Sequence, residues 1–294
     1  MATLSCKQLS KRYGEKTVLE GIDLELRSGK LYGLLGRNGA GKTTLLSLLS
    51  CQNPATSGTV TLDGQPVWEN RKALDRMCFS RELNVNAESG LAGYTVKSYL
   101  RAARIYYPHW DEDLARRLIG EFQLEEKKKL VKLSKGMLSM LTIVVAMASK
   151  AEFTFLDEPA AGLDVVARER FYQLLLEEYT QSGRTFVVST HIIEEAADVL
   201  EEVILLDRGK LLLKEDTQDL LDRARYVYGL EDQVDGATAG LAVHHPERMG
   251  RSKGVTVLLE EGKTLHPGYD VSIQRVNLQK LFVALCGGGE SACG

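Results

Sequence analysis

The segment Gly36–Thr44 constrains this chain more than any other feature. It reads Gly-Arg-Asn-Gly-Ala-Gly-Lys-Thr-Thr and matches the phosphate-binding pattern G-x-x-x-x-G-K-[ST] at every fixed position. The apolar run Leu31–Leu35 precedes it, and Thr44–Ser50 reads as the start of a helix. A strand, a glycine-rich loop and a helix in this order are the context in which the pattern cradles phosphates. The sequence therefore predicts an α/β fold of the P-loop NTPase type.

The chemistry of this loop explains its residue types. Glycines let the backbone curl so that successive N–H groups point at phosphate oxygens, and the helix start adds unpaired donors. Lys42 is expected to reach the β- and γ-phosphates, and the Thr43 hydroxyl is expected to hold Mg²⁺. The complete pattern disfavours the alternative, a chance glycine turn before a helix. The predicted nucleotide-binding residues of the loop are Gly36, Arg37, Asn38, Gly39, Ala40, Gly41, Lys42, Thr43 and Thr44.

Composition argues against several other classes of protein. The 294 residues are 44% apolar and 26% charged, as in globular chains, and the net charge of −3 offers no basic field for nucleic acid. No apolar run is long enough to cross a bilayer, and the N-terminus lacks the apolar core of a signal peptide. The five cysteines are scattered, as expected for thiols in a reducing cytosol. We therefore expect a cytoplasmic protein without a nucleic-acid partner.

Hydrophobic periodicity predicts strands early and late in the chain. Apolar residues alternate with polar ones over residues 22–26, and the candidate strand Thr59–Leu62 runs into an Asp63-Gly64 turn, which together predict an N-terminal antiparallel β subdomain. Later, the candidate strands Phe153–Leu156 and Thr185–Ser189 alternate with helical segments. This alternation predicts a parallel core sheet with helices on its faces.

Composition also divides the chain. Residues 83–149 are rich in Leu, Ala, Lys, Arg and Glu at helical spacing, which predicts a helical insertion. We expect residues 1–215 to form the nucleotide-binding domain that contains this insertion. Residues 216–286 read as a small C-terminal accessory domain, with a short amphipathic helix near its end. The glycine-rich residues 287–294 read as a disordered tail.

Three side chains that follow strands carry candidate chemistry. Asp157 suits the Mg²⁺ shell, directly or through water, and Glu158 suits the base that orients the attacking water. The alternative is an ordinary acid pair in a loop, which the upstream phosphate loop disfavours. His191 follows the next strand, where parallel sheets place their ligands, and we expect it to donate to the γ-phosphate or the attacking water. It also reads as the first residue of the following helix, capped by Ser189 or Thr190.

The segment Leu133–Met137 precedes an apolar helix. Ser134 can cap that helix, whose free N–H groups form an anion site. Taken alone, this is an ordinary helix cap.

In this order the motifs resemble those of the ATP-binding subunit of ABC transporters, over about the first 215 residues. Leu133–Met137 is similar to the family signature Leu-Ser-Gly-Gly-Gln, from which Lys135 and Met137 depart. The resemblance implies that Ser134, with the neighbouring N–H groups at Lys135 and Gly136, binds the γ-phosphate of an ATP held by the opposite subunit. Two ATP molecules would then be sandwiched between two protomers, which are identical or different chains.

Two further segments carry the resemblance. Tyr13 looks like the aromatic residue that stacks on adenine; the alternative is a surface tyrosine in a loop. Residues 161–164 resemble the loop that crosses the dimer interface. Asp164 of that loop is retained, whereas Ala161 stands where Ser is usual, so one hydroxyl contact between subunits is missing.

Glu82 is the clearest departure from the family pattern. The resemblance expects a Gln near this place, whose amide oxygen joins Mg²⁺. A carboxylate is also a hard oxygen ligand, but while ionised it cannot donate a hydrogen bond, and it adds negative charge near the triphosphate. We therefore predict altered Mg²⁺ dependence or slower hydrolysis without loss of ATP binding. The alternative is that Glu82 is a solvated loop acid.

The resemblance implies an ATPase subunit that drives a separate transmembrane permease and lies at the inner face of the membrane through it. The helical insertion and the loop around Glu82 would receive a coupling helix of that permease. The signature variant and the segments Tyr106–Trp110 and Val276–Phe282 are similar to bacterial exporters of the antibiotic-resistance or acetoin-utilisation type, with importers of small solutes left open.

Two other classes of function compete with a transporter subunit. ABC proteins that act on ribosomes or DNA usually carry two nucleotide domains or long coiled coils, whereas this chain has one phosphate loop and a net negative charge. A regulatory switch with poor hydrolysis is suggested by Glu82 and Ala161. The presence of both Glu158 and His191 argues against such a switch.

Overall fold

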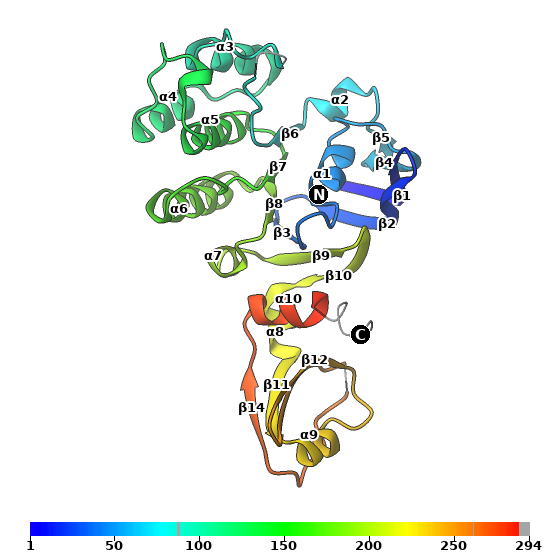
Figure 1. Cartoon of the computed structure of the whole chain (residues 1–294). Helices are drawn as coiled ribbons and strands as arrows, with labels where there is room; N and C mark the ends of the chain where they lie inside the picture. Colours follow the sequence, from blue (N-terminus) through cyan, green and yellow to red (C-terminus); the bar gives the residue numbers. More distant parts are fainter. Residues whose placement is uncertain (87–88, 261, 288–294) are drawn as a thin grey trace. The chain divides into compact units, whose positions relative to one another are not determined.

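The computed structural model describes residues 1–86, 89–260 and 262–287. The chain divides into two compact units, one comprising Met1–Leu213 and a second that begins at Lys214 (Figure 1). Of the tail predicted at residues 287–294, all but Gly287 lies outside the described residues.

A six-stranded sheet forms the centre of the first unit. Parallel registers join β3 to β8 and β9, β8 to β7, and β7 to β6, so the predicted parallel core sheet is confirmed. The strands β3, β7 and β8 are buried along their whole length, because helices or other strands cover both faces. In spatial order the strands are β10 (Lys210–Asp216), β9 (Glu202–Asp207), β3 (Leu31–Leu35), β8 (Thr185–Thr190), β7 (Phe153–Asp157) and β6 (Met77–Ser80).

The predicted N-terminal antiparallel subdomain is a four-stranded sheet. Its order is β2 (Lys16–Arg27), β1 (Thr3–Tyr13), β4 (Ser57–Leu62) and β5 (Gln65–Pro66). Ile22, Leu24 and Leu26 are buried and alternate with exposed residues, as the pattern of a half-buried strand predicts. The Asp63-Gly64 turn joins β4 to β5.

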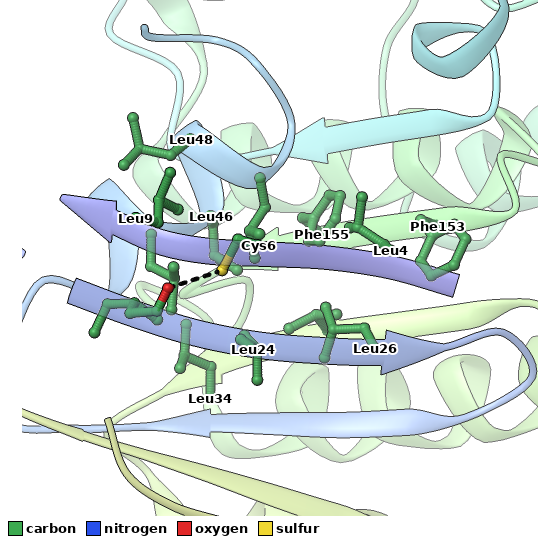
Figure 2. Close-up of a cluster of buried hydrophobic side chains, with 14 of the residues drawn as sticks. Leu4, Cys6, Leu9, Leu24, Leu26, Leu34, Leu46, Leu48, Phe153 and Phe155 are labelled. Carbon is green, nitrogen blue, oxygen red and sulfur yellow. Dashed lines mark hydrogen bonds between the residues drawn. The ribbon is translucent and has the colours of Figure 1, made fainter. Parts of the chain in front are cut away.

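One hydrophobic core joins the two sheets through α1 (Lys42–Leu49), the helix that follows the phosphate loop. Leu4 and Leu24 from the antiparallel sheet, Leu46 from α1 and Phe155 from β7 all belong to it (Figure 2). Within this core, burial raises the pKa of the Cys6 thiol to about 12, so the thiol stays protonated and donates to the backbone oxygen of Ile22 at 3.5 Å. The phosphate loop is therefore anchored at its helical end by the main core of the unit.

The helical insertion is confirmed beside the edge strand β6, where α5 packs on β6, α4 and α3 (Figure 1). Thr95, Asp111 and Ser134 cap its three α-helices with side-chain oxygens. The helices of the first unit that follow α1 are α2 (Arg71–Leu74), α3 (Val96–Tyr106), α4 (Glu112–Glu121), the 3₁₀ helix η2 (Leu130–Lys132), α5 (Lys135–Ala148), α6 (Val165–Ser182) and α7 (Ile193–Ala197).

The second unit contains a small antiparallel sheet with three helices. The sheet order is β12 (Val243–Met249), β13 (Ser252–Leu258), β11 (Ala224–Leu230) and β14 (Val271–Arg275). Val227, Val234, Val255 and Val257 form its core. The helices are α8 (Thr217–Arg223), α9 (Glu231–Ala237) and α10 (Leu278–Cys286). The apolar run Val255–Leu259 predicts a strand and the amphipathic pattern near the end predicts a helix, and the structure has β13 and α10 there. The other strands of this unit, α8 and α9 were not predicted.

In the part of the chain that the structure describes, no helix combines the length and apolar character required to span a bilayer.

A buried ionic network connects the helical insertion to the central sheet. Glu178 of α6 lies 3.0 Å from the Arg184 guanidinium and 2.7 Å from Nζ of Lys150, which also contacts Asp111 at 3.6 Å. The guanidinium donates to the backbone oxygens of Met147 and Ala151. Burial lowers the pKa of Arg184, while the Glu178 carboxylate acts in the opposite direction. Glu178 therefore balances two positive charges at the junction.

We predict that Glu178→Gln lowers the free energy of unfolding by about 3 kcal/mol, because it leaves the buried Arg184 guanidinium without its carboxylate. The matched control is Glu25→Gln, which removes the exposed pair with Arg27 (3.0 Å) and should cost less than about 1 kcal/mol. The measurement is the urea concentration at half-unfolding. If the urea midpoint shifts equally in the two variants, the buried network stabilises the fold no more than the exposed pair does.

Candidate nucleotide-binding site

The carboxyl ends of three adjacent strands bring the predicted site residues together. In the parallel register, Leu35 at the end of β3 lies opposite Thr190 of β8, and Ser189 of β8 lies opposite Asp157 of β7. The phosphate loop, the His191 bend and the carboxylates Asp157 and Glu158 therefore leave the sheet at one edge. This is the edge at which open parallel sheets bind their ligands.

Two glycines of the phosphate loop are required by close backbone contacts. A Cβ at Gly36 would lie 2.6 Å from the backbone oxygen of Leu206. Gly41 has φ +108°, and a Cβ there would lie 2.7 Å from the Leu19 side chain. Both distances are shorter than a van der Waals contact. The backbone can therefore adopt this conformation only with glycine at positions 36 and 41.

The turn between β9 and β10 forms a backbone hydrogen bond with the phosphate loop. The N–H of Gly209 donates to the backbone oxygen of Ala40 at 3.0 Å, and the N–H of Glu20 donates to the oxygen of Gly209 at 3.0 Å. A Cβ at Gly209 would lie 2.3 Å from the oxygen of Val18. A hairpin far along the chain thus fixes both the loop and β2.

The Glu158 carboxylate contacts Lys42 through one of its oxygens and His191 through the other. Nζ of the buried Lys42 donates to the backbone oxygen of Gly36 at 2.8 Å and lies 3.3 Å from Oε1 of Glu158. Nδ1 of His191 lies 2.6 Å from Oε2 of Glu158. When Nδ1 carries the proton of this bond, Nε2 can donate to a phosphate only in the imidazolium form.

The backbone of Glu158 is held in a strained conformation. Its φ of 49° lies in the left-handed region, which is costly for a residue with a side chain. Its N–H donates to the Ser189 hydroxyl at 3.0 Å and lies 3.2 Å from the Ser189 backbone oxygen. The same hydroxyl donates to Oδ1 of Asp157 at 2.7 Å. Ser189, which the sequence suggested only as a helix cap, therefore sets the orientation of both acids.

A pocket of about 600 Å³ surrounds these groups. Its lining includes several residues that the sequence patterns did not single out: Lys16, Thr17 and Val18 at the start of β2, and Arg208 in the β9–β10 turn. The lining also includes predicted residues: Arg37, Asn38, Gly39, Gly41, Lys42, Thr43, Thr44, Glu82, Glu158 and His191. Most of the predicted set therefore shares one hollow.

Tyr13 is not among the lining residues of this pocket. It ends β1, it is 50% exposed, and Nζ of Lys11 lies 4.9 Å from the centre of its ring.

The three predicted metal ligands share a second hollow, of about 530 Å³. Thr43, Glu82 and Asp157 all line it. Within the described ranges no three or more His, Cys, Asp or Glu side chains form a cluster that could hold a metal ion. A hydroxyl and one or two carboxylates nevertheless suit Mg²⁺, which takes further ligands from water and from nucleotide phosphates.

The signature segment packs against the predicted dimer-interface loop. Ser134 accepts a hydrogen bond from the N–H of Met137 at 3.2 Å and so caps α5, as predicted. A Cβ at Gly136 would lie 2.8 Å from the backbone oxygen of Gly162. In the next turn of α5, Ser139 donates to the backbone oxygen of Ala161 at 2.9 Å.

Asp164 caps α6 by accepting from the N–H of Ala167 at 2.9 Å. Ser134, Lys135 and Gly136 lie outside the lining of the P-loop pocket.

His191 lies before α7 and not inside it. The helix begins at Ile193, and Thr190 accepts a hydrogen bond from the N–H of Ile192 at 2.9 Å. The bend therefore leaves the imidazole at the carboxyl edge, 50% exposed, where it can contact a ligand.

A P-loop cradle, a strand-end aspartate and a glutamate between a lysine and a histidine define a nucleotide-hydrolysing P-loop enzyme. The ABC transporter family profile matches residues 19–161. The ABC transporter ATP-binding protein YtrB of Bacillus subtilis is 30% identical over 217 residues, which cover 74% of this chain and 73% of that protein. The chain belongs to the ATP-binding proteins of ABC transporters and is an ATPase of that family.

Other relatives extend the similarity. The bacitracin transport ATP-binding protein BcrA of Enterococcus faecalis is 31% identical and is matched over 80% of this chain and 76% of its own length. The Nod factor export ATP-binding protein I of Burkholderia orbicola is 28% identical over 304 residues, which cover 98% of each chain.

Solved structures agree with the fold of the first unit. An ATP-binding subunit of an ABC transporter superimposes with a TM-score of 0.65 at 25% identity, covering 74% of this chain and 92% of that one. A dimeric ATP-binding cassette with ADP and phosphate gives a TM-score of 0.61 at 24% identity, covering 73% and 98%, and shows the shared fold.

We predict that Ser189→Ala lowers the ATP turnover rate about tenfold to a hundredfold, because small displacements of reacting groups cost this much. Nucleotide affinity should stay within about twofold of the parent, since the phosphate loop is unchanged. The control is Thr154→Val on β7, an equally buried hydroxyl that donates to the backbone oxygen of Ala151. Steady-state turnover and nucleotide titration check the prediction, and unchanged turnover in Ser189→Ala would contradict it.

Proposed function

We propose that this chain binds Mg·ATP in the P-loop pocket and hydrolyses it with Glu158 as the base. The observation that carries the proposal is the position of the Glu158 carboxylate between Lys42 and His191, at 3.3 Å and 2.6 Å. The backbone N–H groups of Gly36–Thr44 and the Lys42 ammonium bind the β- and γ-phosphates. The Thr43 hydroxyl and Asp157 hold Mg²⁺, with Glu82 as a third candidate ligand; when bound, the ion offsets charge on the phosphate oxygens.

The contacts of Lys42 imply how the base becomes available. When Lys42 moves its ammonium to the phosphates, Oε1 of Glu158 loses that partner and can accept a hydrogen bond from the attacking water. His191 keeps Oε2 in place, and its Nε2 can donate to the γ-phosphate as imidazolium. The strained backbone of Glu158 and the Ser189 hydroxyl hold the carboxylate during this exchange.

The site is completed by a second subunit in this proposal. The α5 N-terminus with Ser134, Lys135 and Gly136 binds the γ-phosphate of the opposite protomer, and Asp164 lies in the loop at the interface. The second subunit is a copy of this chain or a related one. Tyr13 stacks on adenine from the end of β1, with the ring face that Lys11 does not cover.

A separate membrane permease is the proposed partner, so the chain would lie at the cytoplasmic face of the membrane. A groove of about 380 Å³ suits a coupling helix of that permease. It is lined by Phe79 and Arg81 near Glu82, and by Tyr99 and Tyr106 of α3. The name of the relative that serves Nod factor export favours export for this chain too. In this proposal residues 1–215 are the ATPase domain and residues 216–286 are an accessory domain.

We predict that Glu158→Gln abolishes hydrolysis and traps an ATP-bound dimer, because the amide cannot accept the proton of the attacking water. Size-exclusion chromatography with and without ATP should show the dimer only with ATP. Glu152→Gln is the control, since it removes a carboxylate from a partly buried pair with Arg76 that does not line the site. A monomeric Glu158→Gln protein that still turns over ATP normally would contradict the assignment of the base.

We also predict that Tyr106→Asp abolishes capture of the permease, because it places a charge in the proposed docking groove. The neighbouring Ile105 is 78% exposed and does not line the groove, so Ile105→Asp is the matched control. The measurement is mass spectrometry of membrane proteins that co-purify with the tagged chain in mild detergent. Basal turnover should be the same in both variants, and equal capture by both would argue against this groove.

A further inference from the structure

Two residues at which the chain departs from the usual ABC pattern contact each other. Oε1 of Glu82 lies 3.2 Å from Nζ of Lys135. Glu82 follows β6 by two residues, and Lys135 is the first residue of α5. The ion pair therefore connects the loop beside the nucleotide to the start of the helix that carries the signature.

The stem of the Lys135 side chain lies against the neighbouring loop. Gly162 has φ +82°, and a Cβ there would lie 2.9 Å from Cγ of Lys135. The aliphatic part of Lys135 thus lies along the backbone of the predicted dimer-interface loop. Only its terminal ammonium extends to Glu82, so the charge and not the stem makes the connection.

The location of Glu82 gives this pair an electrostatic consequence. Glu82 lines one hollow with Thr43 and Asp157 and another with Glu158. A third carboxylate there repels both the acids and a bound triphosphate. Lys135 offsets this charge and draws the Glu82 carboxylate toward α5.

We propose that the Glu82–Lys135 pair is a tether whose members exchange partners when the ATP sandwich forms. The Glu82 carboxylate is held either by Lys135 or by Mg²⁺ in its own site. The Lys135 ammonium is held either by Glu82 or by the γ-phosphate in the opposite protomer. This inference rests on the proposed function. In this scheme, binding of Mg·ATP in one protomer releases the Lys135 ammonium of that protomer, which can then contact the ATP held by the other protomer.

The first test uses dilute monomeric protein and a fluorescent ATP analogue. Lys135→Met keeps most of the stem and removes the charge, so Glu82 is released and the Mg²⁺ concentration for half-maximal binding should fall. Both side chains are more than half exposed, which limits the expected shift to about twofold to fivefold. The same substitution in a Glu82→Gln background should cause no shift.

The matched control is Lys132→Met, which removes a similar exposed charge two residues before the α5 cap. It should leave the Mg²⁺ midpoint unchanged. The tether is overturned if Lys135→Met causes no shift, or shifts the midpoint equally with and without Glu82.

The second test measures ATP-driven dimerisation in the Glu158→Gln background by analytical ultracentrifugation. Glu82→Gln releases Lys135, so half-dimerisation should need about twofold to fivefold less ATP. In a Lys135→Met background Glu82→Gln should have no such effect, and equal effects in both backgrounds would overturn the exchange. If the protein binds ATP but never dimerises, both the proposed ATP sandwich and the proposed contact of Lys135 with a γ-phosphate are wrong. The titration of the monomer then decides by itself whether the ion pair with Lys135 keeps Glu82 from binding Mg²⁺.

Discussion

The register that sets Asp157 opposite Ser189 is the constraint on which the rest of the site depends. It allows one hydroxyl to bind Oδ1 of Asp157 and the N–H of Glu158 together. Because β3 pairs with the other edge of β8, Lys42 then reaches the Glu158 carboxylate. A slip of one residue would turn Ser189 to the opposite face and separate these groups. The other residues of β7 and β8 are all buried and mostly apolar, and they fix the register against such a slip.

The positions of residues that belong to a local sequence pattern could be predicted. The phosphate loop is a contiguous pattern, and Asp157, Glu158 and His191 each follow an apolar strand, so their shared edge followed from parallel pairing. Arg208 could not be predicted, because it reaches the pocket through a hairpin contact with a loop far earlier in the chain. A two-residue turn beside a buried strand is too common a signal to indicate a ligand contact.

The second unit was harder to predict for a different reason. Every side chain of β12 and β14 is exposed or partly exposed. β12 lacks the apolar alternation that marks a half-buried strand, and in β14 the alternation covers only Val271 and Ile273. Proline is rare inside strands and glycine is unfavourable inside helices, yet Pro246 lies within β12 and Gly236 within α9. Long-range pairing with β13 and β11 decides the structure there, and a local pattern carries no information about such pairing.

The contact between Gly209 and Ala40 has a consequence for synthesis on the ribosome. The phosphate loop is translated early, but the hairpin that clasps it emerges only after the strands carrying Asp157 and Ser189. A nascent chain thus holds the glycine segment long before it has a cradle. Nucleotide stabilises only the state that binds it. ATP can therefore stabilise the complete cradle only after the hairpin at Gly209 has left the ribosome, and chains that stall earlier lack this contact.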